Sequence, residues 1–179
     1  MNYPTIASVE EFVRWEEQQA ERYEFSDGRI SLFRGASVRH ELIVVNVSTV
    51  LRVALGPGRV RGAQLKQLTA TSSRYPDLSV SFDPRERPDA THSRYPTLLI
   101  EVLSKSTSAT DRGPKADEYR SLETLREYVI IDSRKRWAQT IRRSGDVWVV
   151  SLPILNGTLD FESVKVQMPF DEIYAGTEL

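Results

Sequence analysis

Three charged residues in the middle of the chain have the types and spacing of a metal-dependent hydrolytic site. Asp77 opens the apolar stretch of "YPDLSV", Glu101 interrupts the apolar run "LLIEVL", and Lys115 follows in "DRGPKADEY". A buried ionised carboxylate is costly unless it gains a proton, a partner or a metal ion. Mg²⁺ is usually held by one or two carboxylates with waters and substrate phosphate. A lysine beside such a pair could position the attacking water or stabilise charge that grows on phosphorus.

Each of the three residues also has an ordinary structural explanation. Glu101 could form an ion pair with Arg112 or Lys105 at the end of a strand. Asp77 could cap a turn before a strand. Lys115 could lie on a solvated helix face. Whether these residues are catalytic or structural therefore depends on how the helices and strands that carry them are arranged.

The N-terminal part of the chain predicts a helix, a hairpin and a second, longer helix. "ASVEEFVRWEEQQ" has capping-box spacing before a helical period. Asp27 and Gly28 form the preferred tight-turn dipeptide between two alternating runs. "SVRHELIVVNVSTVLRVAL" predicts a long helix with Ser37 as its N-cap. We expect its packed stripe to contain Leu42, Val45, Ser48 or Thr49, and Val53.

The rest of the chain is predicted to be rich in strands. Strands are expected near 64–69, 78–82 and 97–103, and a helix is expected from Thr110, with a proline near its start. Strand, helix and strand over 97–132 form the one plausible crossover unit. The segment "TLDFESVKVQMPFDEIY" predicts two short strands and a helical turn. The sequence therefore predicts an α+β (mixed α/β) fold.

Composition narrows the function classes. The chain has 179 residues, which fits one domain over 1–179 with a core of about 22–151. It carries 24 Lys and Arg against 25 Asp and Glu, so a basic surface for nucleic acid would have to be local. Without cysteine, disulfides and thiolate metal sites are excluded, and with no membrane-spanning run or signal peptide we expect a cytoplasmic protein.

The chain resembles the Uma2 family of restriction endonuclease-like proteins. The resemblance covers about residues 22–132, in "RYEFSDGRI", "RHELI", "YPDLSV", "LLIEVLSKST", "DRGPKADEY" and "REYVIID". That family belongs to the PD-(D/E)XK nuclease superfamily. The resemblance therefore implies a restriction-endonuclease-like fold, with a central mixed sheet of four or five strands flanked by helices.

Carried over residue by residue, the resemblance implies that Asp77 and Glu101 are catalytic acids that bind the metal, and that Lys115 is the catalytic lysine. In the simple superfamily pattern the lysine lies two residues after the second acid, where this chain has Leu103. The lysine is therefore expected from the following helix instead. Lys105 is the competing candidate, closer in sequence to the second acid.

The resemblance also implies accessory roles for Glu24, His40 and Tyr119. Glu24 would contact the metal directly or through water, or else lie on the exposed face of its hairpin. His40 would approach the site or bind a phosphate, or else be a packing residue. Tyr119 shares a helix face with Lys115 at i+4 and could simply pack. A main-chain carbonyl near Val102 would complete the metal ligands.

The leading hypothesis is a DNA endonuclease that uses Mg²⁺, with Mn²⁺ as a substitute, and no organic cofactor. We expect a homodimer, because many nucleases cut both strands by pairing two subunits. One alternative is a catalytically weak module that keeps the nuclease fold and binds nucleic acid or a protein. A weaker alternative is a small-molecule hydrolase that uses the same acids.

A cluster of basic residues follows the predicted crossover. It could be a solvated edge that discourages strand pairing, or a rim that contacts phosphates. Its members are Arg134, Lys135, Arg136, Arg142 and Arg143.

Overall fold

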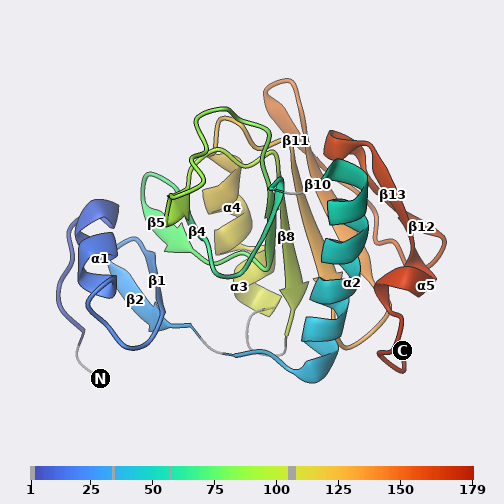
Figure 1. Ribbon diagram of the computed structural model, residues 1–179, viewed down its shortest axis with the longest axis horizontal. Helices are drawn as coiled ribbons and strands as arrows, with labels where there is room; N and C mark the ends of the chain where they lie inside the picture. The colour runs from blue at the N-terminus through green and yellow to red at the C-terminus, as the bar shows by residue number, and fades with distance from the viewer. Residues whose placement is uncertain (1–2, 34, 57, 105–107) are drawn as a thin grey trace.

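The computed structural model describes residues 3–33, 35–56, 58–104 and 108–179. In Figure 1 the first helix and hairpin lie at one side of the molecule, and the C-terminal elements lie at the opposite side. A large sheet and its helices stand between them. Glu24 comes from the hairpin, and the other candidate residues come from the central sheet and its helices.

The central sheet is mixed, as predicted. Within the described residues it has six strands in the order β11-β10-β9-β8-β6-β3. Only the β8–β9 pair among them is parallel. The β10–β11 hairpin and the short β3 extend the sheet beyond the four or five strands that the resemblance implied. The strands are β3 (Val60–Gly62), β6 (Leu78–Val80), β8 (Leu98–Leu103), β9 (Glu127–Asp132), β10 (Ala138–Ser144) and β11 (Val147–Val150).

The parallel strands β8 and β9 are joined by the predicted crossover, since a tight hairpin turn cannot join parallel neighbours. The single helix expected from Thr110 is two short helices, α3 (Ser108–Arg112) and α4 (Pro114–Arg120). Side chains alternate along β8, so Leu99 packs with Tyr119 of α4, whereas Ile100 packs on the other face of the sheet. Glu101 therefore belongs to the face that α4 covers.

The long predicted helix is α2 (Val38–Leu55), and it covers the other face of the central sheet (Figure 1). Ser37 is its N-cap, as predicted, and its side chain accepts a hydrogen bond from the His40 main-chain N–H at 3.3 Å. The cap fixes where the helix begins. His40 thereby lies in the first turn, at the end of α2 that approaches the site.

The predicted buried stripe of α2 is wrong. Val45 and Val53 are 56% and 82% exposed, whereas Ile43, Val47 and Leu51 are fully buried. The buried residues follow i, i+4, i+8 spacing. Valines occur on every side of this helix, so the apolar pattern alone did not distinguish the packed side from the exposed one.

A second sheet carries the N-terminal hairpin. Within the described part of the chain its order is β2-β1-β5-β4-β7. As predicted, Asp27 and Gly28 form the two-residue hairpin turn, and both have the positive φ, 45° and 81°, that a type I′ turn requires. Helix α1 (Val9–Glu16) packs on this sheet through Val9 and Phe12. The strands are β1 (Tyr23–Ser26), β2 (Arg29–Leu32), β4 (Lys66–Leu68), β5 (Ser72–Arg74) and β7 (His92–Ser93).

The C-terminal segment forms the two short strands and the helical turn that were predicted. Its residues Phe161, Met168 and Ile173 join the core that α2 forms on the central sheet. The elements are β12 (Thr158–Phe161), the 3₁₀ turn η1 (Glu162–Val164), β13 (Val166–Pro169) and α5 (Phe170–Ile173). Among the described residues, no helix combines the length and apolar character needed to cross a bilayer.

Candidate active site

Asp77 lies at the start of β6, where its carboxylate caps a neighbouring strand. The main-chain N–H of Val102 in β8 donates to Asp77 Oδ2 at 2.6 Å. His40 Nε2, from the first turn of α2, lies 3.2 Å from the same oxygen. Asp77 is therefore held in place by the sheet on one side and by a helix on the other.

Glu101 lies at the same end of the strand pair as Asp77. Leu78 of β6 pairs with Ile100 of β8, and each acid is the direct sequence neighbour of one member of that pair. The Glu101 side chain is buried, and its Oε1 accepts from Lys115 Nζ at 3.1 Å and from the Tyr119 hydroxyl at 3.0 Å. The partner of Glu101 is thus the predicted catalytic lysine.

Lys115 is buried in the first turn of α4, where its side chain is only 6% exposed. Its Nζ lies 3.1 Å from Glu101, 3.2 Å from Asp111 and 3.4 Å from Glu24. These acids come from β8, α3 and β1. The solvated-face explanation for Lys115 does not hold.

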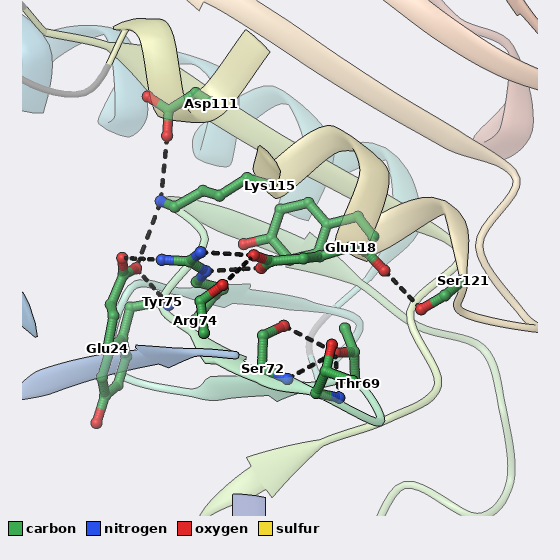
Figure 2. A network of polar contacts seen from close by, with 12 residues as sticks. Glu24, Thr69, Ser72, Arg74, Tyr75, Asp111, Lys115, Glu118 and Ser121 are labelled. Atoms are coloured by element: carbon green, nitrogen blue, oxygen red, sulfur yellow. Dashed lines mark hydrogen bonds and ion pairs between the residues drawn. The ribbon is translucent and has the colours of Figure 1, made fainter. Parts of the chain in front are cut away.

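Glu24 is also drawn into this cluster rather than exposed on its hairpin. Its Oε1 accepts from the Tyr75 main-chain N–H at 3.1 Å, and its Oε2 accepts from Arg74 Nη1 at 3.1 Å. Figure 2 shows Arg74 lying between Glu24 and Glu118, with the Lys115 side chain reaching the same carboxylate end of Glu24. The smaller sheet therefore supplies part of the surroundings of Lys115.

The cluster contains a surplus of negative charge. Burial raises the pKa of Glu101 well above its ordinary value; Lys115 opposes this shift, while Asp111, Asp77 and Glu24 add to it. Burial alone would lower the pKa of Lys115, but these four carboxylates raise it above its usual range. One buried ammonium thus lies among four acids.

The pKa of His40 is shifted by one of these acids, Asp77. Burial alone would lower its pKa, but the hydrogen bond and charge of Asp77 outweigh burial and raise the pKa. Glu41 and the main chain of Val102 contribute in the same direction. Asp77 is therefore the main electrostatic partner of His40.

The residues that the resemblance singled out form two adjoining groups. Lys115 contacts Glu101 and Glu24, and Tyr119 donates to Glu101. His40 contacts Asp77, which accepts from the main chain of Val102, the residue after Glu101. Lys105, the competing lysine, lies outside the described residues. Arg112, considered as a partner of Glu101, instead lies 3.7 Å from Asp132 and over the Trp137 ring.

Sequence reasoning missed three members of the network: Asp111, Arg74 and Glu118. Asp111 has a signal in its i, i+4 spacing to Lys115. Glu118 lies one turn after Lys115, on the same helix. No local pattern marks Arg74, because its partners come from strands and helices far away in the chain.

The basic cluster after the crossover is largely paired within the protein. Arg134 pairs with Asp132 at 2.7 Å and Arg142 with Glu127 at 2.8 Å. Arg143 donates to main-chain carbonyls, including that of Leu122 at 2.9 Å. These contacts favour the structural explanation for the arginines over a phosphate rim.

The donor chemistry of the site suits a hard divalent cation. Carboxylate and main-chain oxygens are the ligands that Mg²⁺ prefers, and it needs only one or two protein carboxylates. A cation beside Asp77 and Glu101 would also offset the surplus negative charge. Within the described ranges, no group of three or more acidic, histidine or cysteine side chains is arranged to hold a metal.

The architecture is that of a nuclease-like mixed α/β fold. It is similar to a protein from Anabaena variabilis whose crystal structure is described as "a putative nuclease belonging to DUF820". The TM-score is 0.74 and the sequence identity 19%, over 95% of this chain and 98% of that one.

The chain belongs to the Uma2 family, whose model, described as "Putative restriction endonuclease", matches residues 9–166. Two relatives come from Synechocystis sp. The uncharacterized protein slr1290 is 33% identical over 94% of this chain and 92% of its own length. The uncharacterized protein sll1609 is 29% identical over 90% of this chain and 96% of its own length.

Proposed function

We propose that this protein is a metal-dependent DNA endonuclease of the PD-(D/E)XK type, which hydrolyses phosphodiester bonds with Mg²⁺ or Mn²⁺. The observation that carries the proposal is the position of Asp77 and Glu101 beside one pair of antiparallel strands, with Lys115 on Glu101. Membership of a restriction endonuclease-like family and a nuclease-like fold support it.

Asp77 and Glu101 would hold the metal, together with the main-chain carbonyl of Val102. When bound, the metal would stabilise the charge that develops on the scissile phosphate. Val102 N–H and His40 orient the Asp77 carboxylate, so its free rotation is already restricted. Such restriction lets a site act with little reorganisation.

Lys115 would supply positive charge beside the reacting phosphate. Its ammonium group donates to Glu101 at 3.1 Å and could exchange this bond for one to the attacking water or a phosphate oxygen. Tyr119 donates to the same Glu101 oxygen and would keep that carboxylate oriented during the exchange. Asp111 and Glu24 would remain partners of Lys115.

The test is cleavage of duplex and single-stranded DNA with Mg²⁺, with Mn²⁺ and with a chelator. We expect cutting that requires the metal and is lost in Asp77→Asn and in Glu101→Gln. The matched control is Asp89→Asn, because Asp89 is exposed and pairs only with exposed Arg87 among the described residues. Urea unfolding of each variant separates lost chemistry from lost folding. Metal-dependent cutting that survives both site substitutions would refute the assignment.

A second candidate is a nuclease-fold module that binds nucleic acid and cuts it poorly. The observation that favours it is Leu103, which is fully buried where the simple pattern carries its lysine. DNA binding that weakens with salt, without cutting of any substrate in either metal, would select this alternative.

A further inference from the structure

Arg74 is a buried arginine of β5 that joins two acids from different parts of the fold. Its Nε and Nη2 donate to the two carboxylate oxygens of Glu118 at 2.7 and 2.6 Å. Its remaining terminal nitrogen, Nη1, donates to Glu24 Oε2 at 3.1 Å. The side chain is only 6% exposed, so this fork cannot be a general surface contact with DNA.

Glu24 contacts Lys115, and Glu118 lies on the same helix as Lys115. Glu24 uses its other oxygen, Oε1, for Lys115 Nζ at 3.4 Å and for the Tyr75 N–H at 3.1 Å. Glu118 lies one turn after Lys115 on α4 and is also held by the Ser26 hydroxyl at 2.6 Å. Arg74 thus connects the hairpin that carries Glu24 to the helix that carries Lys115 (Figure 2).

The position of the ammonium group depends on a competition between acids. Glu24 and Glu101 both attract Lys115 Nζ, from 3.4 and 3.1 Å. Arg74 engages the other oxygen of Glu24, Oε2, at 3.1 Å, which offsets part of the attraction between Glu24 and Lys115. Without that fork, Glu24 would draw the ammonium toward the hairpin and away from Glu101.

We propose that Arg74 is a positioning residue of the candidate site, which holds Glu24 back so that the Lys115 ammonium stays on Glu101. The catalytic consequence of this proposal rests on the nuclease function proposed above. The predicted effect of Arg74 on the Lys115–Glu101 contact does not depend on the nuclease function. Lysine could not replace Arg74, because a single ammonium cannot make two parallel bonds to Glu118 and a third to Glu24.

The test compares Arg74→Lys with Arg87→Lys. Arg87 is a matched control, since its Nε and Nη2 make a similar fork to Asp89, at 3.1 and 2.8 Å, but both side chains are exposed. In crystal structures without metal or DNA, we expect the Lys115–Glu101 contact to be lost in Arg74→Lys and kept in Arg87→Lys. A folded Arg74→Lys protein that keeps the contact would overturn the proposal.

Kinetics give the second readout. We expect Arg74→Lys to lower kcat by about 10- to 100-fold, the size expected when a reacting group is misplaced by about 1 Å, with KM nearly unchanged. Counting active sites corrects for unfolded protein, and a purely structural Arg74 would leave the corrected kcat unchanged. If the wild-type protein does not cut DNA, the nuclease function fails, and the crystal structures still decide the geometric claim.

Glu118→Gln covers the case in which Arg74→Lys does not fold. Loss of the Glu118 charge leaves the Arg74 guanidinium to Glu24, which weakens the attraction between Glu24 and Lys115. We therefore expect the Lys115–Glu24 distance to increase while the Lys115–Glu101 contact is kept. A Glu118→Gln structure in which Lys115 instead leaves Glu101 would contradict the proposed competition.

Discussion

Lys115 is a buried cation that contacts three buried or half-buried acids. Its Nζ lies within 3.4 Å of Glu101, Asp111 and Glu24, so its removal would leave carboxylates in a region that water reaches poorly. We expect Lys115→Met to lower the free energy of unfolding by about 3–5 kcal/mol, as for other broken buried pairs. Urea denaturation measures this loss.

The control is Lys135→Met, because Lys135 is exposed and a surface substitution changes the free energy of unfolding by about 0.5 kcal/mol or less. Adding Glu101→Gln to Lys115→Met should recover part of the loss, since one uncompensated carboxylate is then gone. Equal losses at Lys115 and Lys135 would mean that the buried network does not stabilise the fold.

Glu118 makes the stability of the protein depend on pH. Burial alone would raise its pKa, but hydrogen bonds from Arg74 and Ser26 outweigh burial and lower the pKa. A carboxyl with a lowered folded-state pKa stabilises the protein above its unfolded pKa, about 4.5, and loses this contribution as pH falls through the folded-state pKa. Wild type should therefore exceed Glu118→Gln in stability near neutral pH, and the difference should shrink in acid.

Urea unfolding of both proteins between about pH 3 and 7 gives this difference. Asp117→Asn, at an exposed neighbour on the same helix, corrects for the general effect of removing one negative charge. A difference between wild type and Glu118→Gln that stays constant over the whole range would show that Glu118 does not stabilise through its charge.

At the scale of elements, the packed side of α2 differs from the side that the apolar pattern predicted. Val47 is fully buried against the central sheet and the C-terminal segment, whereas Val45, two residues earlier, is 56% exposed. Val47→Ala should cost about 1–3 kcal/mol of unfolding free energy, because it leaves a cavity. Val45→Ala should be nearly neutral, since alanine has the higher helix propensity.

Thermal or urea unfolding of the two variants compares the same chemical change at two positions of one helix. A larger loss of unfolding free energy for Val45→Ala than for Val47→Ala would support the packed stripe that the sequence predicted. Similar losses at both would mean that the exposed side of α2 is also packed in solution.

Elements with strong local signals were predictable from the sequence. The Asp27–Gly28 turn, the α2 cap at Ser37 and the crossover between β8 and β9 each follow from neighbouring residues. Strands β3 and β5 have only three residues each and no alternation to mark them. They form because neighbouring strands supply their hydrogen bonds, which is a tertiary effect.

The same distinction applies to the candidate site. Glu101 was recognisable because a carboxylate in an apolar run needs a partner, and Lys115 followed from the family resemblance. Arg74 was not recognisable, because its role arises only where the smaller sheet meets α4. Residues that act through other residues have no local sequence signature.

At the scale of the whole molecule, charge decides how DNA could bind. The formal net charge is −1, so attraction to a polyanion must come from a limited set of arginines and lysines. Several of these are already paired within the protein, including Arg74, Arg134 and Arg142. A nuclease built this way should make few phosphate contacts through free cations.

We therefore expect DNA binding with a shallow dependence on salt. The logarithm of the association constant falls with the logarithm of salt concentration by about 0.9 for each phosphate contact on duplex DNA. Measured on a duplex in chelator, where cutting is prevented, the slope should correspond to a few contacts only. Adding Mg²⁺ should strengthen binding in the wild type and not in a protein that carries Asp77→Asn and Glu101→Gln, because the metal would bridge these acids to a phosphate. A steep slope with no effect of Mg²⁺ would instead indicate a basic surface away from these acids, and with it a binding module rather than a nuclease.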